Sequence, residues 1–146
     1  MDESCMTSDS NIFGKRIGRG KTRIVYAHSK NPNWVVKQII QKENPSPKSN
    51  QIEWNVWLAV KDTPFADLFC PCVELTDDGH IIMLRCNPIQ KEYKKIPTIL
   101  DVRPPKDTKN RKNYGLLGDR SVLIDYGHLD FAPLVDALNQ YKSQMK

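Results

Sequence analysis

Hydrophobic and polar positions at the start of the chain follow patterns that predict short strands. Residues 12–18 and 22–29 are rich in β-branched and aromatic side chains and lie on either side of a glycine-containing turn. This arrangement predicts two antiparallel strands. Turn-forming residues at 29–33 precede a nearly continuous apolar run at 33–40. Such a run is typical of a strand covered on both faces, so a third strand is expected here.

A helix is predicted next, after a segment at 42–48 in which prolines interrupt regular structure. Its apolar residues are spaced as on one face of a helix of about three turns. They are Ile52, Val56, Ala59 and Val60. We expect Ser49 or Asn50 to cap the start of this helix, because a side-chain oxygen there can accept hydrogen bonds from the first amides.

The second half of the chain contains two predicted hairpins and a final helix. Apolar runs flank Asp-Asp-Gly within 72–86 and Gly-Asp-Arg within 113–127, and both tripeptides favour turns. Residues 130–146 predict an amphipathic helix, with Pro133 tolerated in its first turn. Its apolar side is formed by Leu134, Val135, Leu138 and Tyr141. Between the hairpins, prolines permit at most a short helix at about 91–102. The order of elements predicts an α+β fold.

Composition indicates a single domain outside the membrane. The chain has 146 residues, of which 39% are hydrophobic, and this is enough to bury one core. No apolar run approaches the ~18 residues that a membrane-spanning helix needs. Residues 1–11 are acidic and polar, unlike a secretory signal. We therefore expect a flexible N-terminal segment and a cytoplasmic protein.

The positive net charge is concentrated in one segment. Residues 91–112 contain eight Lys or Arg and three acidic residues, an excess equal to the +5 of the whole chain. A solvated, flexible face explains this pattern. A docking surface for phosphate groups or for an acidic protein partner explains it equally, and nucleic acid is not the expected partner.

The four cysteines are expected to be reduced thiols. They are Cys5, Cys70, Cys72 and Cys86. The Cys-Pro-Cys at 70–72 lacks the spacing of a zinc knuckle, and no second Cys or His pair follows it. Buried small side chains are the simpler interpretation.

The segment 17–27, IGRGKTRIVYA, resembles the glycine-rich loop of protein kinases, which closes over the phosphates of ATP. Gly18 and Gly20 match the first two glycines of that loop. Arg23 stands where the third glycine is expected, so its guanidinium could lie near a phosphate. Val25 matches the apolar residue that covers adenine. The resemblance therefore implies a nucleotide partner.

Lys37 lies inside the apolar run of the third predicted strand, where an ammonium group needs a compensating anion. In protein kinases the corresponding lysine contacts ATP phosphates and a glutamate of the following helix. Glu53 is the matching glutamate. The resemblance implies that Lys37 and Glu53 form an ion pair and position ATP, whereas the alternative is that both side chains face solvent.

Asp-Tyr-Gly at 125–127 follows an apolar strand and resembles the kinase Asp-Phe-Gly. By this resemblance Asp125 would hold Mg²⁺ and Asn113 would be a second ligand. Met83 matches the gatekeeper residue, and backbone groups from Leu84 to Cys86 would hydrogen-bond adenine. The implied architecture is a kinase-like small lobe at 12–86, with a five-stranded antiparallel sheet and one helix, and a severely truncated large lobe at 87–146.

The catalytic loop departs from the kinase pattern. A kinase places its proton-accepting aspartate five residues before the asparagine, but position 108 here is Thr. Asp107 lies one residue too early and lacks a preceding His-Arg, so a bulge would be needed to direct it into the site. Lys109 matches a lysine of many kinase catalytic loops. The residues after Gly127 are too few for an activation segment.

Two functions are consistent with these motifs. One is a minimal phosphotransferase of the serine/threonine kinase type, dependent on ATP and Mg²⁺, with Lys37, Glu53 and Asp107 as catalytic residues. Such an enzyme would resemble small kinase-like proteins of bacteriophages or bacterial effectors and act on host proteins in the host cytoplasm. The other is a pseudokinase binding module that inhibits or redirects a partner protein. An unrelated α+β domain is a third interpretation.

Overall fold

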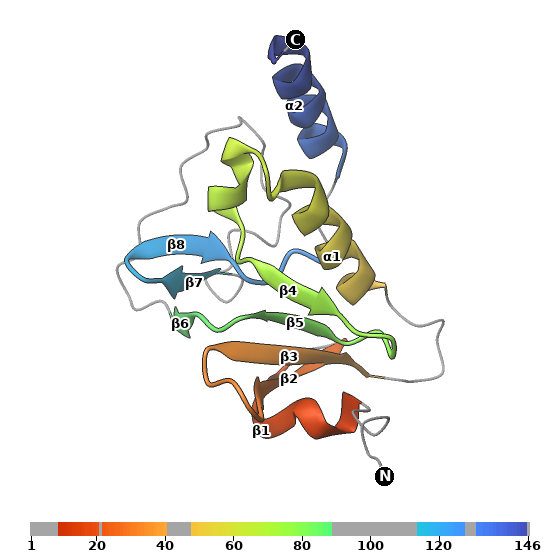
Figure 1. Cartoon of the computed structure of the whole chain (residues 1–146), viewed down its shortest axis with the longest axis vertical. Coiled ribbons are helices and arrows are strands. Elements are labelled where there is room, and N and C mark those ends of the chain that lie inside the picture. The colour runs from red at the N-terminus through yellow and green to blue at the C-terminus, as the bar shows by residue number, and fades with distance from the viewer. Residues whose placement is uncertain (1–8, 21, 41–47, 89–113, 128–130, 146) are drawn as a thin grey trace.

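The computed structural model describes residues 9–20, 22–40, 48–88, 114–127 and 131–145. This part of the chain has an α+β fold with a five-stranded antiparallel sheet, a smaller three-stranded sheet and two α-helices (Figure 1). The predicted fold class is confirmed at this level. The segment 91–112, including its expected short helix, Asp107 and Lys109, lies outside the described residues, as does Asn113.

The main sheet forms where the apolar and β-branched runs predict strands. Its strands are β1 (Phe13–Arg19), β2 (Arg23–His28), β3 (Trp34–Ile39), β4 (Cys72–Leu75) and β5 (Ile81–Leu84). They are hydrogen-bonded in the order β1-β2-β3-β5-β4. The most apolar strands, β3 and β5, therefore lie inside the sheet, where both faces are covered. Before them, Asp9–Ile12 forms the 3-10 helix η2, which overlaps the end of the segment 1–11 that was expected to be flexible.

The pairing of β2 with β3 brings together residues from two of the recognised motifs. Val25 pairs with Lys37, and Arg23 pairs with Ile39. On its other side β3 pairs with β5, where Lys37 is opposite Ile81. The edge strand β1 has two register irregularities, and its hairpin with β2 is closed by the amide of Gly20 donating to the carbonyl of Arg23 at 2.8 Å. Bulges of this kind bend an edge strand away from a flat ladder.

Helix α1 (Ser49–Val60) packs against β3, β4 and β5, and it differs from prediction in two respects. The helix begins at Ser49 with Lys48 as its cap, so neither Ser49 nor Asn50 is the cap, and both are buried instead. The predicted face is also shifted, because Ala59 is exposed while Glu53 is buried. Asn50 and Glu53 lie on the buried face of the first turns because they have polar partners there, as described below.

The second sheet is built by the predicted hairpin and an additional short strand. It contains β6 (Asn87–Pro88), β7 (Tyr114–Leu117) and β8 (Arg120–Leu123). The turn between β7 and β8 uses Gly118, whose φ of 68° lies in the left-handed region that favours glycine. Residues before β4 meet β8: Phe69 forms a parallel bridge with Leu123, and the Cys70 amide donates to the Leu123 carbonyl at 2.8 Å.

Two further helices complete the described fold. The 3-10 helix η3 (Pro64–Leu68) begins after Thr63, whose hydroxyl accepts a hydrogen bond from the Phe65 amide. Helix α2 (Phe131–Gln144) places Leu134 and Leu138 in the core. The rings of Tyr141 and Phe65 have centroids 5.8 Å apart, so α2 packs on η3. The prediction was wrong for Val135, which is 46% exposed.

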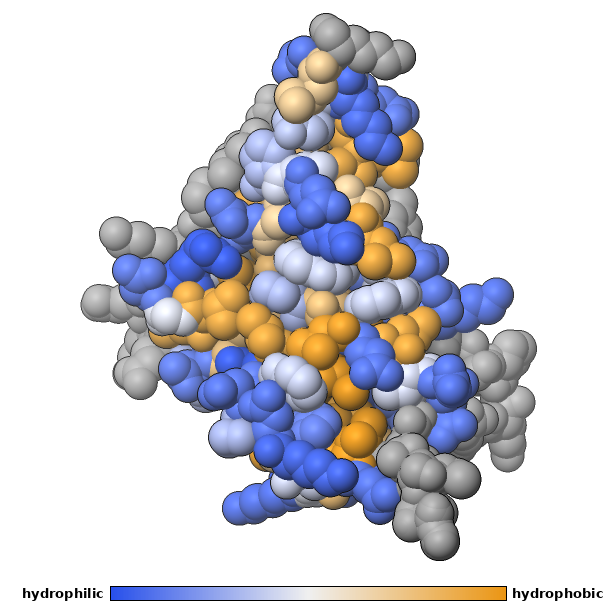
Figure 2. Space-filling model, viewed as in Figure 1, coloured by the Kyte–Doolittle hydropathy of each residue, from blue (hydrophilic) through white to orange (hydrophobic). Residues whose placement is uncertain are grey.

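The hydrophobic core lies between α1 and the strands and extends to η3 and α2. Its most buried members include Val56, Val60, Ile81 and Val122. On the face seen in Figure 2, hydrophobic side chains gather across the middle of the molecule, over β4 and β5, while hydrophilic ones predominate below, over β1 and β2. Within the described ranges, no helix is both long and apolar enough to cross a membrane.

Candidate functional site

Lys37 and Glu53 form the ion pair expected from the sequence. The Nζ atom of Lys37, on β3, lies 3.0 Å from Oε1 of Glu53, on α1, and both residues are buried. Lys37 also donates from Nζ to the carbonyl of Ile124. Because a desolvated ammonium group is unstable without an anion, these contacts explain how β3 accepts a lysine within its apolar run.

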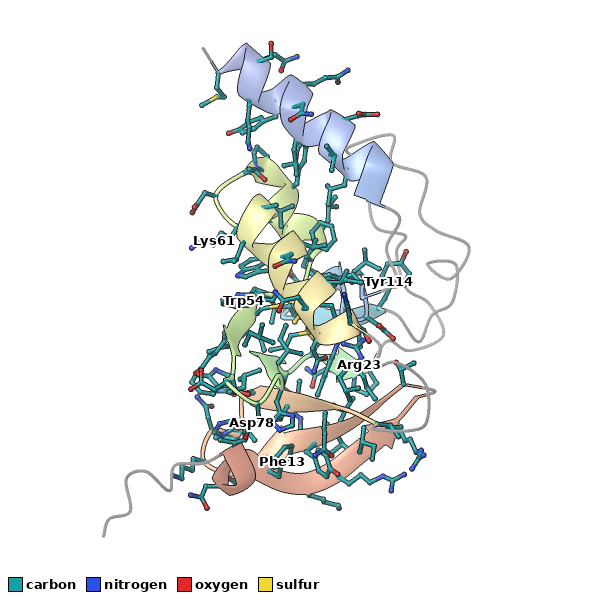
Figure 3. The ribbon with its side chains drawn as sticks, turned by 90° about the vertical axis from the view of Figure 1, so that its right-hand side faces the viewer. Phe13, Arg23, Trp54, Lys61, Asp78 and Tyr114 are labelled. Atoms are coloured by element: carbon teal, nitrogen blue, oxygen red, sulfur yellow. The ribbon has the colours of Figure 1, made fainter. Side chains whose placement is uncertain are left out.

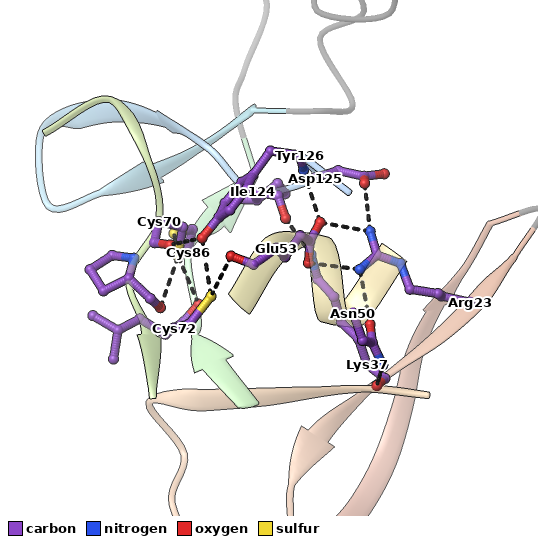
Figure 4. Close-up of polar contacts among 12 residues, drawn as sticks. Arg23, Lys37, Asn50, Glu53, Cys70, Cys72, Cys86, Ile124, Asp125 and Tyr126 are labelled. Atoms are coloured by element: carbon purple, nitrogen blue, oxygen red, sulfur yellow. Dashed lines mark hydrogen bonds and ion pairs between the residues drawn. The ribbon is translucent and has the colours of Figure 1, made fainter. Parts of the chain in front are cut away.

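Arg23 also lies in this buried site, at its centre, rather than in a loop over it. Its guanidinium makes two parallel hydrogen bonds with Glu53, 2.7 Å from Nη1 to Oε1 and 2.8 Å from Nη2 to Oε2. Nη2 is also 2.5 Å from Oδ1 of Asp125, which follows β8. Figure 4 shows the guanidinium between the two carboxylates, and Figure 3 shows Arg23 near the start of α1. Arg23 therefore joins the first hairpin, α1 and the Asp-Tyr-Gly motif.

Asn50 completes the polar contacts at the start of α1. Its Oδ1 accepts from Nη1 of Arg23 at 3.1 Å. Its Nδ2 donates to the carbonyls of Lys37 and Gly79, each at 2.8 Å. Sequence reasoning assigned Asn50 only a capping role, although its position three residues before Glu53 places the two side chains on the same helix face. That spacing could have predicted that Asn50 lies beside Glu53 in the site.

Tyr126 and Gly127 fasten the Asp-Tyr-Gly motif to α1 and to the segment before β4. The Tyr126 amide donates to Oε2 of Glu53 at 2.8 Å, and the Tyr126 hydroxyl donates to the Cys70 carbonyl at 2.8 Å. Gly127 approaches Ser49 so closely that a Cβ added to it would lie 2.8 Å from the Ser49 carbonyl oxygen. The glycine is thus needed for close packing between this motif and the helix start.

Replacing Gly127 with alanine is expected to lower the free energy of unfolding by about 1–3 kcal/mol, because the added methyl group meets helix backbone that cannot move aside cheaply. Chemical denaturation of the two proteins measures this. Gly18→Ala is the matched control, since nothing lies within 4 Å of a Cβ added there, and its effect should stay within about 0.5 kcal/mol. Equal stabilities of the two variants would contradict the packing role.

The carboxylate of Glu53 is stabilised in its charged form. Burial alone would raise its pKa, but the charges of Lys37 and Arg23 and their hydrogen bonds outweigh burial and lower the pKa from 4.5 to about 2. The charged form of Arg23 is stabilised in the same way. Burial of the guanidinium lowers its pKa, but Glu53 and Asp125 outweigh burial and raise the pKa overall. Two cations and two carboxylates therefore face one another in the site.

Acid is expected to remove part of the folding stability through Glu53. Because its folded pKa of about 2 lies below its ordinary value of 4.5, the contribution is complete above about pH 4.5 and is lost as the pH falls to about 2. The difference corresponds to about 3 kcal/mol. Urea unfolding over this pH range measures the loss. A stability that stays constant between these pH values would contradict the ionised state of Glu53.

The other predicted nucleotide contacts lie on the strands and the first hairpin of the main sheet. Gly18 and Gly20 belong to the β1–β2 hairpin, and Val25, which pairs with Lys37, packs against the core. Met83 is buried on β5, opposite Val35, as a core residue would be. These residues occupy the strands and turns expected from the order of the motifs along the chain. Whether they contact a nucleotide stays a prediction.

The segment expected to bind adenine already uses much of its backbone. The Leu84 amide donates to the Pro71 carbonyl at 3.0 Å, and the Arg85 amide donates to the Asn33 carbonyl at 2.7 Å. The Leu84 carbonyl accepts from the Cys70 thiol at 3.2 Å. Cys86 is half-buried beside this segment. Adenine binding through Leu84 or Arg85 amides would therefore require these hydrogen bonds to break.

The carboxylates in the site do not fit Mg²⁺ in this arrangement. Asp125 contacts the Arg23 guanidinium, and both oxygens of Glu53 are engaged by Arg23, Lys37 and the Tyr126 amide. A search of the described residues finds no group of three or more His, Cys, Asp or Glu arranged to hold a metal. The other expected ligand, Asn113, and Asp107 are outside those residues. A metal bound through Oδ1 of Asp125 would have to displace the guanidinium.

No protein-family model matches this chain, and a search of curated proteins finds no match either. Its function is therefore inferred from the chemistry of the site itself.

Proposed function

We propose that this protein is a kinase-like binding module that acts on a partner protein without phosphoryl transfer. The observation that carries the proposal is the contact of 2.5 Å between Arg23 and Asp125, the aspartate that matches the metal ligand of the kinase motif. A fixed guanidinium supplies the positive charge that this carboxylate needs. Phosphoryl transfer depends on metal ions that bridge the phosphates, so a site whose metal ligand is paired internally lacks that component.

The charge balance of the site supports the same function. Lys37 and Arg23 are compensated by Glu53 and Asp125, so a triphosphate would bring negative charge into a site that is already neutral. In a kinase, divalent metal ions offset that charge. Adenine binding through the amides of Leu84 or Arg85 would add a second cost, because their present hydrogen bonds must break first.

A minimal ATP- and Mg²⁺-dependent phosphotransferase is the second candidate, and the Lys37–Glu53 ion pair favours it. Its distance of 3.0 Å is that of a formed ion pair, which is the arrangement an active kinase requires. In this function Oδ1 of Asp125 becomes a Mg²⁺ ligand only when Arg23 leaves it. Asp107 would then accept the proton of the substrate hydroxyl.

Incubation of the purified protein with γ-labelled ATP and Mg²⁺, alone and with a generic acceptor protein, separates the two functions. The binding module is expected to transfer no label to itself or to the acceptor. Label that appears in the native protein and is lost in Asp125→Asn would contradict the proposal and establish the phosphotransferase. Asp119→Asn, in the exposed turn between β7 and β8, is the matched control.

The basic segment 91–112 is the proposed docking surface for an acidic partner. Reversing Lys94, Lys95 and Lys109 to glutamate is expected to slow association strongly at low salt and less at high salt, because exposed charges act over about 10 Å at 0.1 M salt. Association kinetics with polyglutamate as the acidic probe measure this. The same reversal at Lys15, Lys30 and Lys61, which are exposed in the described fold, is the control. Equal slowing in both variants would show only an effect of net charge.

A further inference from the structure

Two thiols lie within contact distance of each other beside the second sheet. The Sγ atoms of Cys70 and Cys86 are 3.3 Å apart, although sixteen residues separate them in the sequence. Cys70 precedes β4, and Cys86 follows β5. Both are free cysteines, and Figure 4 shows them together near Tyr126, away from the Arg23 guanidinium.

The surroundings of the pair allow the two sulfurs to approach. A Cβ added to Gly115, on β7, would lie 2.7 Å from Cβ of Cys86, so the absence of a side chain there leaves space for Cys86. The Cys70 amide donates to the Leu123 carbonyl at 2.8 Å, and its thiol donates to the Leu84 carbonyl at 3.2 Å. These two hydrogen bonds hold Cys70 against β8 and β5, next to Cys86.

The two thiols differ in exposure and in pKa. Cys86 is half-buried, whereas Cys70 is fully buried. The hydrogen bond between the two thiols lowers the pKa of Cys86 more than burial raises it, and the charges of Lys37 and Arg120 lower it further. The same hydrogen bond and burial raise the pKa of Cys70. Cys86 is thus suited to react first, and Cys70 to react with it.

We propose that Cys86 and Cys70 form a redox-sensitive site that reacts with hydroperoxides and closes to a reversible disulfide. The Cys86 thiolate attacks one peroxide oxygen and the O–O bond breaks, which leaves a sulfenic acid on Cys86 and a hydroxide that takes up the proton of the original thiol. The Cys70 sulfur then attacks the Cys86 sulfur, and its proton leaves with the departing hydroxyl as water. Together the thiols lose two electrons and two protons, and one hydrogen peroxide becomes two waters.

The third thiol of this region is not suited to the reaction. The Sγ atom of Cys72 is 3.1 Å from the Tyr126 hydroxyl, and burial raises the pKa of Cys72 to about 12. It therefore stays protonated near neutral pH and is a poor nucleophile. The disulfide would instead tie the segment after β5 to the segment before β4, and both of these contact the second sheet. This inference does not rest on the proposed function.

The test is to expose the folded, native protein to hydrogen peroxide, alkylate the remaining thiols, and map disulfides by non-reducing digestion and mass spectrometry. The expected product is a Cys70–Cys86 cross-link that dithiothreitol reverses. Before oxidation, iodoacetamide is expected to modify Cys86 at least about tenfold faster than Cys70 or Cys72. A cross-link involving Cys72, a Cys86 sulfenic acid that never becomes a disulfide, or no reaction at Cys86 would each overturn the proposal.

Variants assign the order of events. Cys86→Ser should abolish the reaction, while Cys70→Ser should leave a sulfenic acid on Cys86 that dimedone traps. Cys5→Ser is the control and should leave the cross-link unchanged. Dimedone adduct on Cys70 instead of Cys86 in the native protein would reverse the assigned roles and overturn the mechanism. Because the mapping uses native protein, a failure of Cys70→Ser to fold leaves the main test intact.

Discussion

Glu53→Gln is expected to lower the free energy of unfolding by about 3–5 kcal/mol, the range found when one partner of a buried ion pair is removed. The neutral amide keeps the shape of the side chain but no longer compensates the two cations that contact it, Lys37 and Arg23. The amide nitrogen of the new side chain would also place N–H groups opposite the N–H donors of Arg23, Lys37 or Tyr126. An effect of this size removes much of the stability of an ordinary domain.

Denaturant unfolding of the native protein and the variant measures this loss. Glu74→Gln on β4 makes the same chemical change at an exposed position and should alter stability by no more than about 0.5 kcal/mol. If both variants are equally stable, the buried carboxylate does not organise the site and the account of α1 is wrong.

Arg23→Met is expected to have the second-largest effect, a loss of about 2–4 kcal/mol. Methionine can fill much of the space with apolar atoms, but Asn50 and Glu53 lose a hydrogen-bond donor. The loss should be smaller than for Glu53→Gln. Glu53 keeps its contacts with Lys37 and the Tyr126 amide, and the side chain of Asp125 is 40% exposed and can be hydrated.

Thermal and denaturant unfolding measure the effect of Arg23→Met, with Arg19→Met as the control. Arg19 is exposed on β1, four residues before Arg23, so the control changes the same residue type in the same hairpin. A native-like stability of Arg23→Met would show that its guanidinium is not part of the buried network.

The strands and helices were predictable because their patterns are local. Alternating or continuous apolar runs identified β1 to β5, and glycine-containing turns identified both hairpins. The exposed sides of the helices were less predictable, as Ala59 and Val135 show. Helical spacing assigns apolar residues to a face, but which face is buried depends on the segments packed against it. For α1 these include Gly127, which brings Ser49 into the interior.

The Lys37–Glu53 pair was predictable, whereas the role of Arg23 was not. An isolated lysine in an apolar strand requires an anion, and the following helix offered one. The motif assigned Arg23 to a loop position, but pairing with β3 directs its side chain under α1. The available signal was the charge sum: Lys37, Glu53 and Asp125 together leave one negative charge that a second cation must balance. Sequence reasoning assigned that role to Mg²⁺, and the fold supplies Arg23.

The central claim is that Arg23 provides the cation at Asp125, so the native protein does not use Mg²⁺ there. The most direct measurement is the melting temperature of the native protein and of Arg23→Met, each with and without millimolar Mg²⁺ and ATP. A ligand present at 100 times its dissociation constant stabilises a protein by about 2.7 kcal/mol, which shifts melting by several degrees. We predict no such shift for the native protein and an upward shift for Arg23→Met, in which Asp125 is released. A Mg²⁺-dependent upward shift of the native protein would contradict the claim.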